Sequence, residues 1–331
     1  MKKLINEVDN VVTEMLDGMV AAYPQYVKRL PGLEVLVRAG GSEGKVALVS
    51  GGGSGHEPAH GGFVGKGMLD GAVAGAVFTS PTPDQVYEAI KAANGGKGVL
   101  LVIKNYTGDV MNFEMAADMA ADDGIEVDKV IVADDVAVEN STWTTGRRGI
   151  AGTIFVHKLA GACAEAGGDL AAVKGVAEKV IANVRSMGMA VDACTVPAAG
   201  KPSFDLAEDE IEIGIGIHGE PGTHREKLTT VNEISDKLLE KILAEGIYNS
   251  GDEVAVMVNG MGGTPLMELF VANNHIKDVL AAKGIRIYKT LVGNYMTSLD
   301  MEGFSITLLK LDDELKPLLD APADTPAFVQ F

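Results

Sequence analysis

The chain has 331 residues, of which 47% are hydrophobic and 22% are charged, and this balance is typical of a globular protein with a sizeable core. Its formal net charge of −18 argues against a nucleic acid partner, because an acidic surface repels a phosphate backbone. Two cysteines are too few for a disulfide framework, and neither a signal peptide nor a membrane-length apolar run occurs, so we expect a cytoplasmic protein.

The spacing of apolar residues predicts strands that alternate with helices. The predicted helices cover residues 4–19, 83–93, 110–121, 154–162, 170–184, 228–243 and 266–272. The predicted strands cover residues 45–49, 72–78, 98–103, 130–132, 211–217 and 253–258. Before residue 185 the alternation is typical of a largely parallel sheet covered on both faces. The pattern then starts afresh, so we predict an α/β fold with two domains, 1–185 and 186–331, each a sheet flanked by helices.

A glycine-rich segment, residues 51–55, follows the predicted strand 45–49. Its four glycines allow positive φ angles and let the backbone come close to a ligand. Pro58 suits the first position of a helix, because it has no N–H to lose there. A strand end, a bare loop and a helix start are typical of the binding crevice of an open α/β sheet. We therefore interpret His56, in this loop, as a candidate ligand contact.

Two patterns match known motifs only in their letters. His56 and His60 fit H-E-x-x-H, but a zinc site of that type needs both histidines on one continuous helix, and Pro58 is expected to begin the helix after His56. Residues 214–219 fit G-x-G-x-x-G, but residues 220–222 prolong a turn where a dinucleotide fold begins a helix. No Walker A sequence occurs either. We therefore expect this chain to bind neither a metal nor a nucleotide.

Three predicted strand ends carry polar side chains that could meet at one crevice. His56 follows the first, Lys104 and Asp109 follow the second, and His218 follows the third. Asp109 suits an N-cap and could also accept the proton of a substrate hydroxyl. A neutral imidazole such as His218 can add to the carbonyl carbon of a ketone or aldehyde. Backbone N–H groups of a glycine loop suit the oxygen that then becomes tetrahedral.

Eight motifs follow one another over nearly the whole chain. They are residues 51–58 (GGGSGHEP), 78–84 (FTSPTPD), 103–109 (IKNYTGD), 145–149 (TGRRG), 195–202 (TVPAAGKP), 216–222 (GIHGEPG), 297–301 (TSLDM) and 303–309 (GFSITLL). Together they resemble the dihydroxyacetone kinase family. The resemblance implies a substrate-binding subunit made of two α/β domains and usually found as a homodimer.

The resemblance also implies a role for each candidate residue. A histidine at the position of His218 bonds through Nε2 to the substrate carbonyl carbon and forms a hemiaminal. Ser80 would line the pocket. The residues implied to hold the substrate hydroxyls are Gly53, Ser54, Gly55, His56, Lys104 and Asp109. His56 and Asp109 stay open as alternative general bases for the hydroxyl that is phosphorylated.

The partners follow from the same resemblance. Family members that use ATP in a single chain carry an additional helical nucleotide domain after this region, whereas this sequence ends at Phe331. We therefore expect the phosphotransferase-system form. In that form a separate subunit holds ADP or ATP with Mg²⁺, and a third protein passes it phosphate originating from phosphoenolpyruvate. This chain would then need no cofactor of its own.

Two other functions remain as alternatives. A non-catalytic relative would bind dihydroxyacetone through the same histidine and co-activate a transcription regulator. The presence of His56, Lys104, Asp109 and the paired arginines 147 and 148 favours the kinase over that reading. A nicotinamide-linked oxidoreductase rests only on the weak glycine pattern and would require NAD binding.

Overall fold

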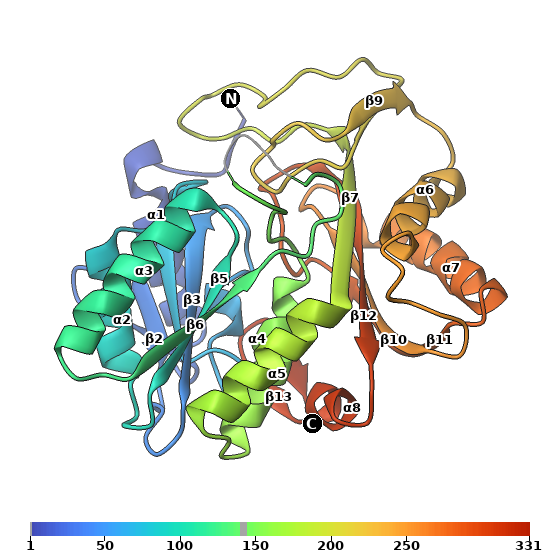
Figure 1. Ribbon diagram of the computed structural model, residues 1–331. Helices are drawn as coiled ribbons and strands as arrows, with labels where there is room; N and C mark the ends of the chain where they lie inside the picture. The colour runs from blue at the N-terminus through green and yellow to red at the C-terminus, as the bar shows by residue number, and fades with distance from the viewer. Residues whose placement is uncertain (1, 140–143) are drawn as a thin grey trace.

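The computed structural model describes residues 2–139 and 144–331. Within these residues the chain forms two six-stranded sheets, a two-stranded ribbon near the C-terminus, and helices that pack on the sheets (Figure 1). The predicted fold class, α/β with sheets flanked by helices, is confirmed. No helix in the described ranges is both long and apolar enough for a membrane crossing.

The first sheet has the strand order β1-β2-β4-β3-β5-β6. Its strands are β1 (Val27–Arg29), β2 (Val35–Arg38), β3 (Ala47–Ser54), β4 (Gly71–Val77), β5 (Val99–Lys104) and β6 (Val127–Val132). β4, β3, β5 and β6 pair in parallel, while β1 and β2 form an antiparallel edge. Every residue of β5 is buried, as a central strand covered on both faces requires. The predicted largely parallel sheet is therefore present.

The second sheet has the strand order β11-β10-β12-β7-β8-β9. Its strands are β7 (Val184–Asp192), β8 (Glu210–Ile213), β9 (His224–Lys227), β10 (Glu253–Gly260), β11 (Arg286–Gly293) and β12 (Glu302–Leu311), and the small ribbon pairs β13 (Ala323–Asp324) with β14 (Val329–Gln330). β10 and β11 pair in parallel, and every other neighbouring pair of this sheet in the described residues is antiparallel. The two sheets therefore differ in strand direction.

Helices cover the outer faces and fill the space between the sheets. They are η1 (Val8–Asn10), α1 (Val11–Ala22), η2 (Gly61–Phe63), α2 (Pro83–Ala93), α3 (Thr107–Asp122), α4 (Thr153–Glu165), α5 (Leu170–Asn183), α6 (Val231–Leu243), α7 (Leu266–Ala282) and α8 (Leu315–Asp320). α2 and α3 pack on the first sheet, and α6 and α7 pack on the second. α4 and α5 lie between the two sheets (Figure 1). The apolar cluster around them includes Leu100 and Met257, one from each sheet, so the two halves share this layer. The domain division at residue 185 stays a prediction.

The structure corrects the predicted surroundings of the glycine segment. β3 continues through the glycines to Ser54, and Pro58 begins no helix, because residues 55–60 form bends and turns before η2. The strand extends through the glycines because β3 pairs closely with β4 here. A Cβ on Gly51 would come within 2.4 Å of the Val73 carbonyl oxygen, so this close pairing requires glycine. His56 nevertheless lies in a loop, as predicted.

Several other predicted boundaries shift, among them the start of one helix, which was predicted at residue 228 and lies at residue 231. The first α-helix begins at Val11 after the short η1, and α7 extends to Ala282, ten residues beyond the predicted end. α3 begins earlier than predicted, so Asp109 lies in its first turn, while the N-cap position belongs to Tyr106. β8 ends at Ile213, because Gly214 has a φ of 78° and turns the chain. His218 therefore lies in a turn after β8 instead of ending a strand.

Candidate functional site

A cavity of about 680 Å³ opens beside the carboxyl ends of β3, β4 and β5. Parallel strands present their carboxyl ends at one edge, which is where open α/β sheets bind ligands. Its lining residues are Gly53, Phe78, Thr79, Ser80, Tyr106, Thr107, Gly108, Asp109, Asn112 and His218. Four of the predicted site residues, Gly53, Ser80, Asp109 and His218, therefore line one cavity.

His218 reaches the cavity from the turn after β8. Its ring Nδ1 lies 2.9 Å from Oε1 of Glu220, and its backbone N–H donates to Oε2 of the same carboxylate at 2.9 Å. Because an ionised carboxylate only accepts hydrogen bonds, Nδ1 carries the hydrogen, and Nε2 of the neutral ring carries a lone pair. The side chain remains 16% exposed, so a small molecule can reach that nitrogen.

Glu220 is the most informative side chain that the sequence reasoning missed. It is buried, and burial alone would raise its pKa, but attraction to His218, the hydrogen bond from His218 and the charge of Arg148 outweigh burial and bring the pKa to about 2. The carboxylate therefore stays ionised at neutral pH and stabilises positive charge on the ring of His218. Residues 220–222 were interpreted only as a turn, and the signal was an acid two positions after a candidate histidine.

His56 lies next to His218, with ring centroids 4.7 Å apart. Its Nδ1 is 2.8 Å from the carbonyl oxygen of Thr297, so Nδ1 donates and Nε2 is the acceptor nitrogen. Nε2 has no hydrogen-bond partner among the residues that the structure describes. Complete burial, with the neighbouring charges of His218 and Lys104, holds the pKa of His56 well below its usual value. His56 is therefore a neutral hydrogen-bond acceptor at neutral pH.

Lys104 and Asp109 form a buried pair at the end of β5 and the start of α3. Lys104 Nζ lies 3.6 Å from Asp109 Oδ2, and both side chains are buried. The other carboxylate oxygen, Oδ1, has no hydrogen-bond partner within the described ranges. A Cβ on Gly52 would come within 2.7 Å of Nζ, so glycine at this position gives the lysine its space. Asp109 thus brings an unpaired acceptor to the cavity.

The remaining predicted residues divide into two groups. Gly53 and Ser80 line the cavity, and a Cβ on Gly53 would come within 2.6 Å of the backbone nitrogen of Thr79. Ser54 instead donates its hydroxyl to the carbonyl of Gly75 at 2.7 Å, and the Gly55 N–H donates to the carboxylate of Glu57. Neither Ser54 nor Gly55 is among the cavity-lining residues.

Two aromatic rings enclose the histidines, and neither ring was predicted. Tyr106 contacts the His218 ring edge-on at 4.5 Å, and Phe78 stacks on His56 at 5.2 Å. Phe78 has a φ of 57°, a conformation that costs free energy in a residue with a side chain and that is frequent at functional sites. The rings keep water from much of the imidazole surface, which strengthens electrostatic interactions in the site.

The H-E-x-x-H letters do not form a shared helical face, because His56 and His60 lie in non-helical turns. His60 Nδ1 lies 2.9 Å from His157 Nε2, so His60 is paired with His157, whereas a zinc motif would require pairing with His56. Residues 2–139 and 144–331 contain no group of three or more potential metal ligands.

Comparison with known proteins gives a consistent picture. The model of the Dak1 domain matches residues 17–327. A protein of Listeria innocua serovar 6a, named as the dihydroxyacetone-binding subunit DhaK of PTS-dependent dihydroxyacetone kinase 1, is 56% identical over 329 residues, which cover 99% of this chain and 100% of that protein.

Two solved structures share the fold over almost the whole chain. The dihydroxyacetone kinase operon co-activator Dha-DhaQ aligns with a TM-score of 0.91 and 38% identity over 98% of this chain and 99% of that one. The dihydroxyacetone kinase from C. freundii, in complex with AMP-PNP and Mg²⁺, aligns with a TM-score of 0.91 and 36% identity, covering 99% of this chain and 61% of that one.

Proposed function

The chain belongs to the Dak1 domain family, and from that premise we propose that it is the dihydroxyacetone-binding subunit of a phosphotransferase-system-dependent dihydroxyacetone kinase. The full-length similarity to a Listeria subunit of that name supports the proposal. The observation that carries the chemistry is the geometry of His218. Its Nδ1 is held by a buried carboxylate, which leaves Nε2 as the free nitrogen of a residue that lines the cavity.

In the proposed first step, His218 captures the ketone covalently. The Nε2 lone pair forms a bond to the carbonyl carbon, and the π electrons of the C=O bond move to the oxygen. The ring becomes cationic, and the ionised Glu220 stabilises that charge through Nδ1–H. A proton from solvent neutralises the alkoxide, and the hemiaminal keeps its ring proton on Nδ1, so the adduct is a cationic ring paired with the Glu220 carboxylate. Glycerol has no carbonyl group and would therefore not be captured.

In the second step, a hydroxyl of the captured triose attacks the γ-phosphorus of ATP bound on a separate subunit, with Mg²⁺ there. A P–O bond to the substrate forms, the bond to ADP breaks, and the hydroxyl proton goes to a base. We assign that base to Asp109, because it lines the cavity and its Oδ1 is unpaired in the described residues. His56 does not line the cavity, and we assign to its neutral Nε2 the role of accepting a hydrogen bond from a substrate hydroxyl.

The surrounding assembly follows from the same proposal. A nucleotide-carrying subunit docks over the cavity, a phosphate-donor subunit recharges its ADP at the expense of phosphoenolpyruvate, and two copies of this chain form a homodimer in the cytoplasm. Mg²⁺ and nucleotide belong to the partner subunit. The homodimer can be tested by sedimentation of the purified chain at several concentrations.

A reconstituted reaction tests the proposed function. The chain is mixed with its nucleotide subunit, the phosphate-donor proteins and phosphoenolpyruvate, and dihydroxyacetone phosphate is measured. We expect product that depends on every component and none from glycerol. Dihydroxyacetone binding without any product would contradict the kinase function.

A second candidate is supported by one observation, the 0.91 TM-score and 38% identity with a protein named as an operon co-activator that aligns over 99% of its own length. Such a protein would bind dihydroxyacetone without phosphorylating it. The same reconstitution separates the two: good ligand binding together with no dihydroxyacetone phosphate would leave the co-activator function in place.

A further inference from the structure

Arg148 connects the N-terminal half of the chain to the turn that carries His218. It lies in the loop between β6 and α4, and its side chain is completely buried. Nε lies 2.7 Å from Oδ2 of Asp135, and Nη2 donates to the Gly214 carbonyl at 2.7 Å. Gly214 is the residue at which β8 ends and the turn toward His218 begins. One buried cation therefore holds the start of that turn.

The third nitrogen of the same guanidinium faces Glu220. A Cβ built on Gly216 would lie 2.0 Å from Oε2 of Glu220 and 2.7 Å from Nη1 of Arg148, so both groups crowd one face of this glycine. Nη1 has no hydrogen-bond partner among the described residues. The φ of Gly216 lies outside the left-handed region, unlike that of Gly214 at 78°. Glycine is thus required at 216 for space, and the space is filled by a carboxylate and a guanidinium.

We propose that Arg148 is a positioning residue for the reaction: it holds Glu220 and the turn after Gly214 in place, so that His218 presents Nε2 to the ketone. This inference rests on the proposed function. It adds a residue that does not line the cavity and acts through Glu220 and through the Gly214 carbonyl. The charge of Arg148 acts together with that of His218 to lower the pKa of Glu220 against the effect of burial. Asp135 supplies the counter-charge on the far side of the guanidinium.

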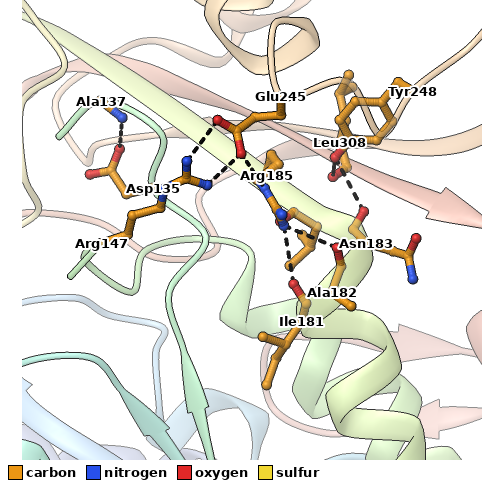
Figure 2. Close-up of polar contacts among 11 residues, drawn as sticks. Asp135, Ala137, Arg147, Ile181, Ala182, Asn183, Arg185, Glu245, Tyr248 and Leu308 are labelled. Atoms are coloured by element: carbon orange, nitrogen blue, oxygen red, sulfur yellow. Dashed lines mark hydrogen bonds and ion pairs between the residues drawn. The ribbon is translucent and has the colours of Figure 1, made fainter. Parts of the chain in front are cut away.

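The neighbouring arginine provides a matched control. Arg147 and Arg185 converge on the carboxylate of Glu245, with an Arg185 Nε to Oε2 distance of 2.9 Å (Figure 2). This cluster also joins distant parts of the chain, but none of its three members lines the cavity. The same arginine-to-lysine change at position 147 therefore tests the effect of disturbing an inter-segment ion pair that does not include Glu220.

The experiment measures the fraction of chain that carries the adduct, using dihydroxyacetone labelled with ¹³C at the carbonyl carbon. The variants are Arg148→Lys, Gly216→Ala and the control Arg147→Lys, each with a thermal melt. Lysine cannot reach Asp135, the Gly214 carbonyl and Glu220 together, and an alanine methyl at 216 would push the carboxylate and the guanidinium apart while keeping both charges. We expect the adduct equilibrium constant to fall about fivefold in both variants, within the range of coupling between residues of one polar network, and to be unchanged in the control.

A double-mutant cycle tests whether the effect passes through Glu220. In the Glu220→Gln background, Arg148→Lys should cause a smaller loss of adduct than in the wild-type background, because the carboxylate that it positions is already gone and only the hydrogen bond to the Gly214 carbonyl is still disturbed. Unchanged adduct in both Arg148→Lys and Gly216→Ala would overturn the inference, as would an undiminished effect of Arg148→Lys in the Glu220→Gln background. A wild-type chain that forms no adduct would overturn the proposed function itself, and the inference with it.

Discussion

His56 and His218 lie with their rings 4.7 Å apart, yet two different kinds of hydrogen-bond partner fix them. Nδ1 of His56 donates to a neutral backbone carbonyl, whereas Nδ1 of His218 faces a buried carboxylate. A carbonyl orients the ring but provides no full negative charge. A carboxylate orients the ring and also provides that charge. Of the two rings, only that of His218 has a negative partner that stabilises a positive charge when the ring forms a bond. His56 is kept neutral and serves as an acceptor.

Removal of either ring gives the largest expected difference. His218→Ala should abolish the reversible mass increase of the intact chain on addition of dihydroxyacetone, because no other free imidazole lines the cavity in the described residues. His56→Ala should retain that mass increase. An adduct that survives in the His218 variant, or disappears only in the His56 variant, would reverse the assignment.

Asp109→Asn separates capture from phosphoryl transfer. The amide keeps the size of the side chain but loses the basic carboxylate, so kcat of the reconstituted kinase should fall by about 10² to 10⁴-fold. The adduct on His218 should persist in this variant, as shown by the same mass measurement. Normal turnover would remove Asp109 from the mechanism and leave His56 as the base.

Glu220→Gln gives His218 a neutral hydrogen-bond partner like that of His56, and so tests the contribution of the carboxylate charge alone. A charge-assisted hydrogen bond is worth about 1 kcal/mol more than a neutral one, so the adduct equilibrium constant should fall about fivefold. A variant that forms the adduct as well as the wild type would show that the carboxylate does not stabilise the cationic ring.

The same variant should change the acid stability of the chain. The folded-state pKa of Glu220, about 2, lies below its ordinary value of 4.5. Its contribution to the free energy of unfolding is therefore fully present above pH 4.5 and is lost as the pH falls through about 2. Between these pH values the wild type should lose stability more steeply than Glu220→Gln, as measured by chemical denaturation at each pH. Parallel curves would contradict the lowered pKa.

The smallest expected effects distinguish Ser80 from Ser54, two serines that were both predicted at the substrate site. Ser80 lines the cavity, whereas Ser54 donates to the Gly75 carbonyl. Ser80→Ala should weaken dihydroxyacetone binding a few-fold, by about 1 kcal/mol or less, with little change in stability. Ser54→Ala should lower the free energy of unfolding by about 1 kcal/mol and leave binding unchanged. Calorimetric titration and denaturation measure the two quantities, and the reverse result would place Ser54 at the ligand.

Sequence reasoning located the residues that follow strands, because the carboxyl ends of parallel strands meet at one edge. That rule predicted Asp109 and His218 at one crevice, and both line the cavity, although α3 begins earlier than predicted and β8 ends before His218. Pro58 was assigned to a helix because its local preference was considered without the pairing of β3 with β4, which extends the strand through Gly53. Local propensity gave way to tertiary contacts at this point.

Glu220 and Arg148 could not be assigned from the sequence in the same way. The hydrogen bond from Arg148 to the Gly214 carbonyl spans 66 positions, and no local pattern predicts which buried carboxylate an arginine will meet. Glu220 lies within a motif of turn residues, where its side chain has no spacing that marks it as buried. A signal was present in Gly216, whose lack of a side chain makes room for both groups.

The most direct test of the central claim is an NMR spectrum of the wild-type chain, with ¹⁵N in the histidine rings and dihydroxyacetone labelled with ¹³C at the carbonyl carbon. Covalent capture predicts that the bound carbon moves from the ketone region to the range of a tetrahedral carbon. It also predicts one-bond coupling of that carbon to Nε2 of His218, a signal that the His218→Ala chain lacks. A bound ligand whose carbon stays in the ketone or hydrate position, with no coupling to ring nitrogen, would contradict the account.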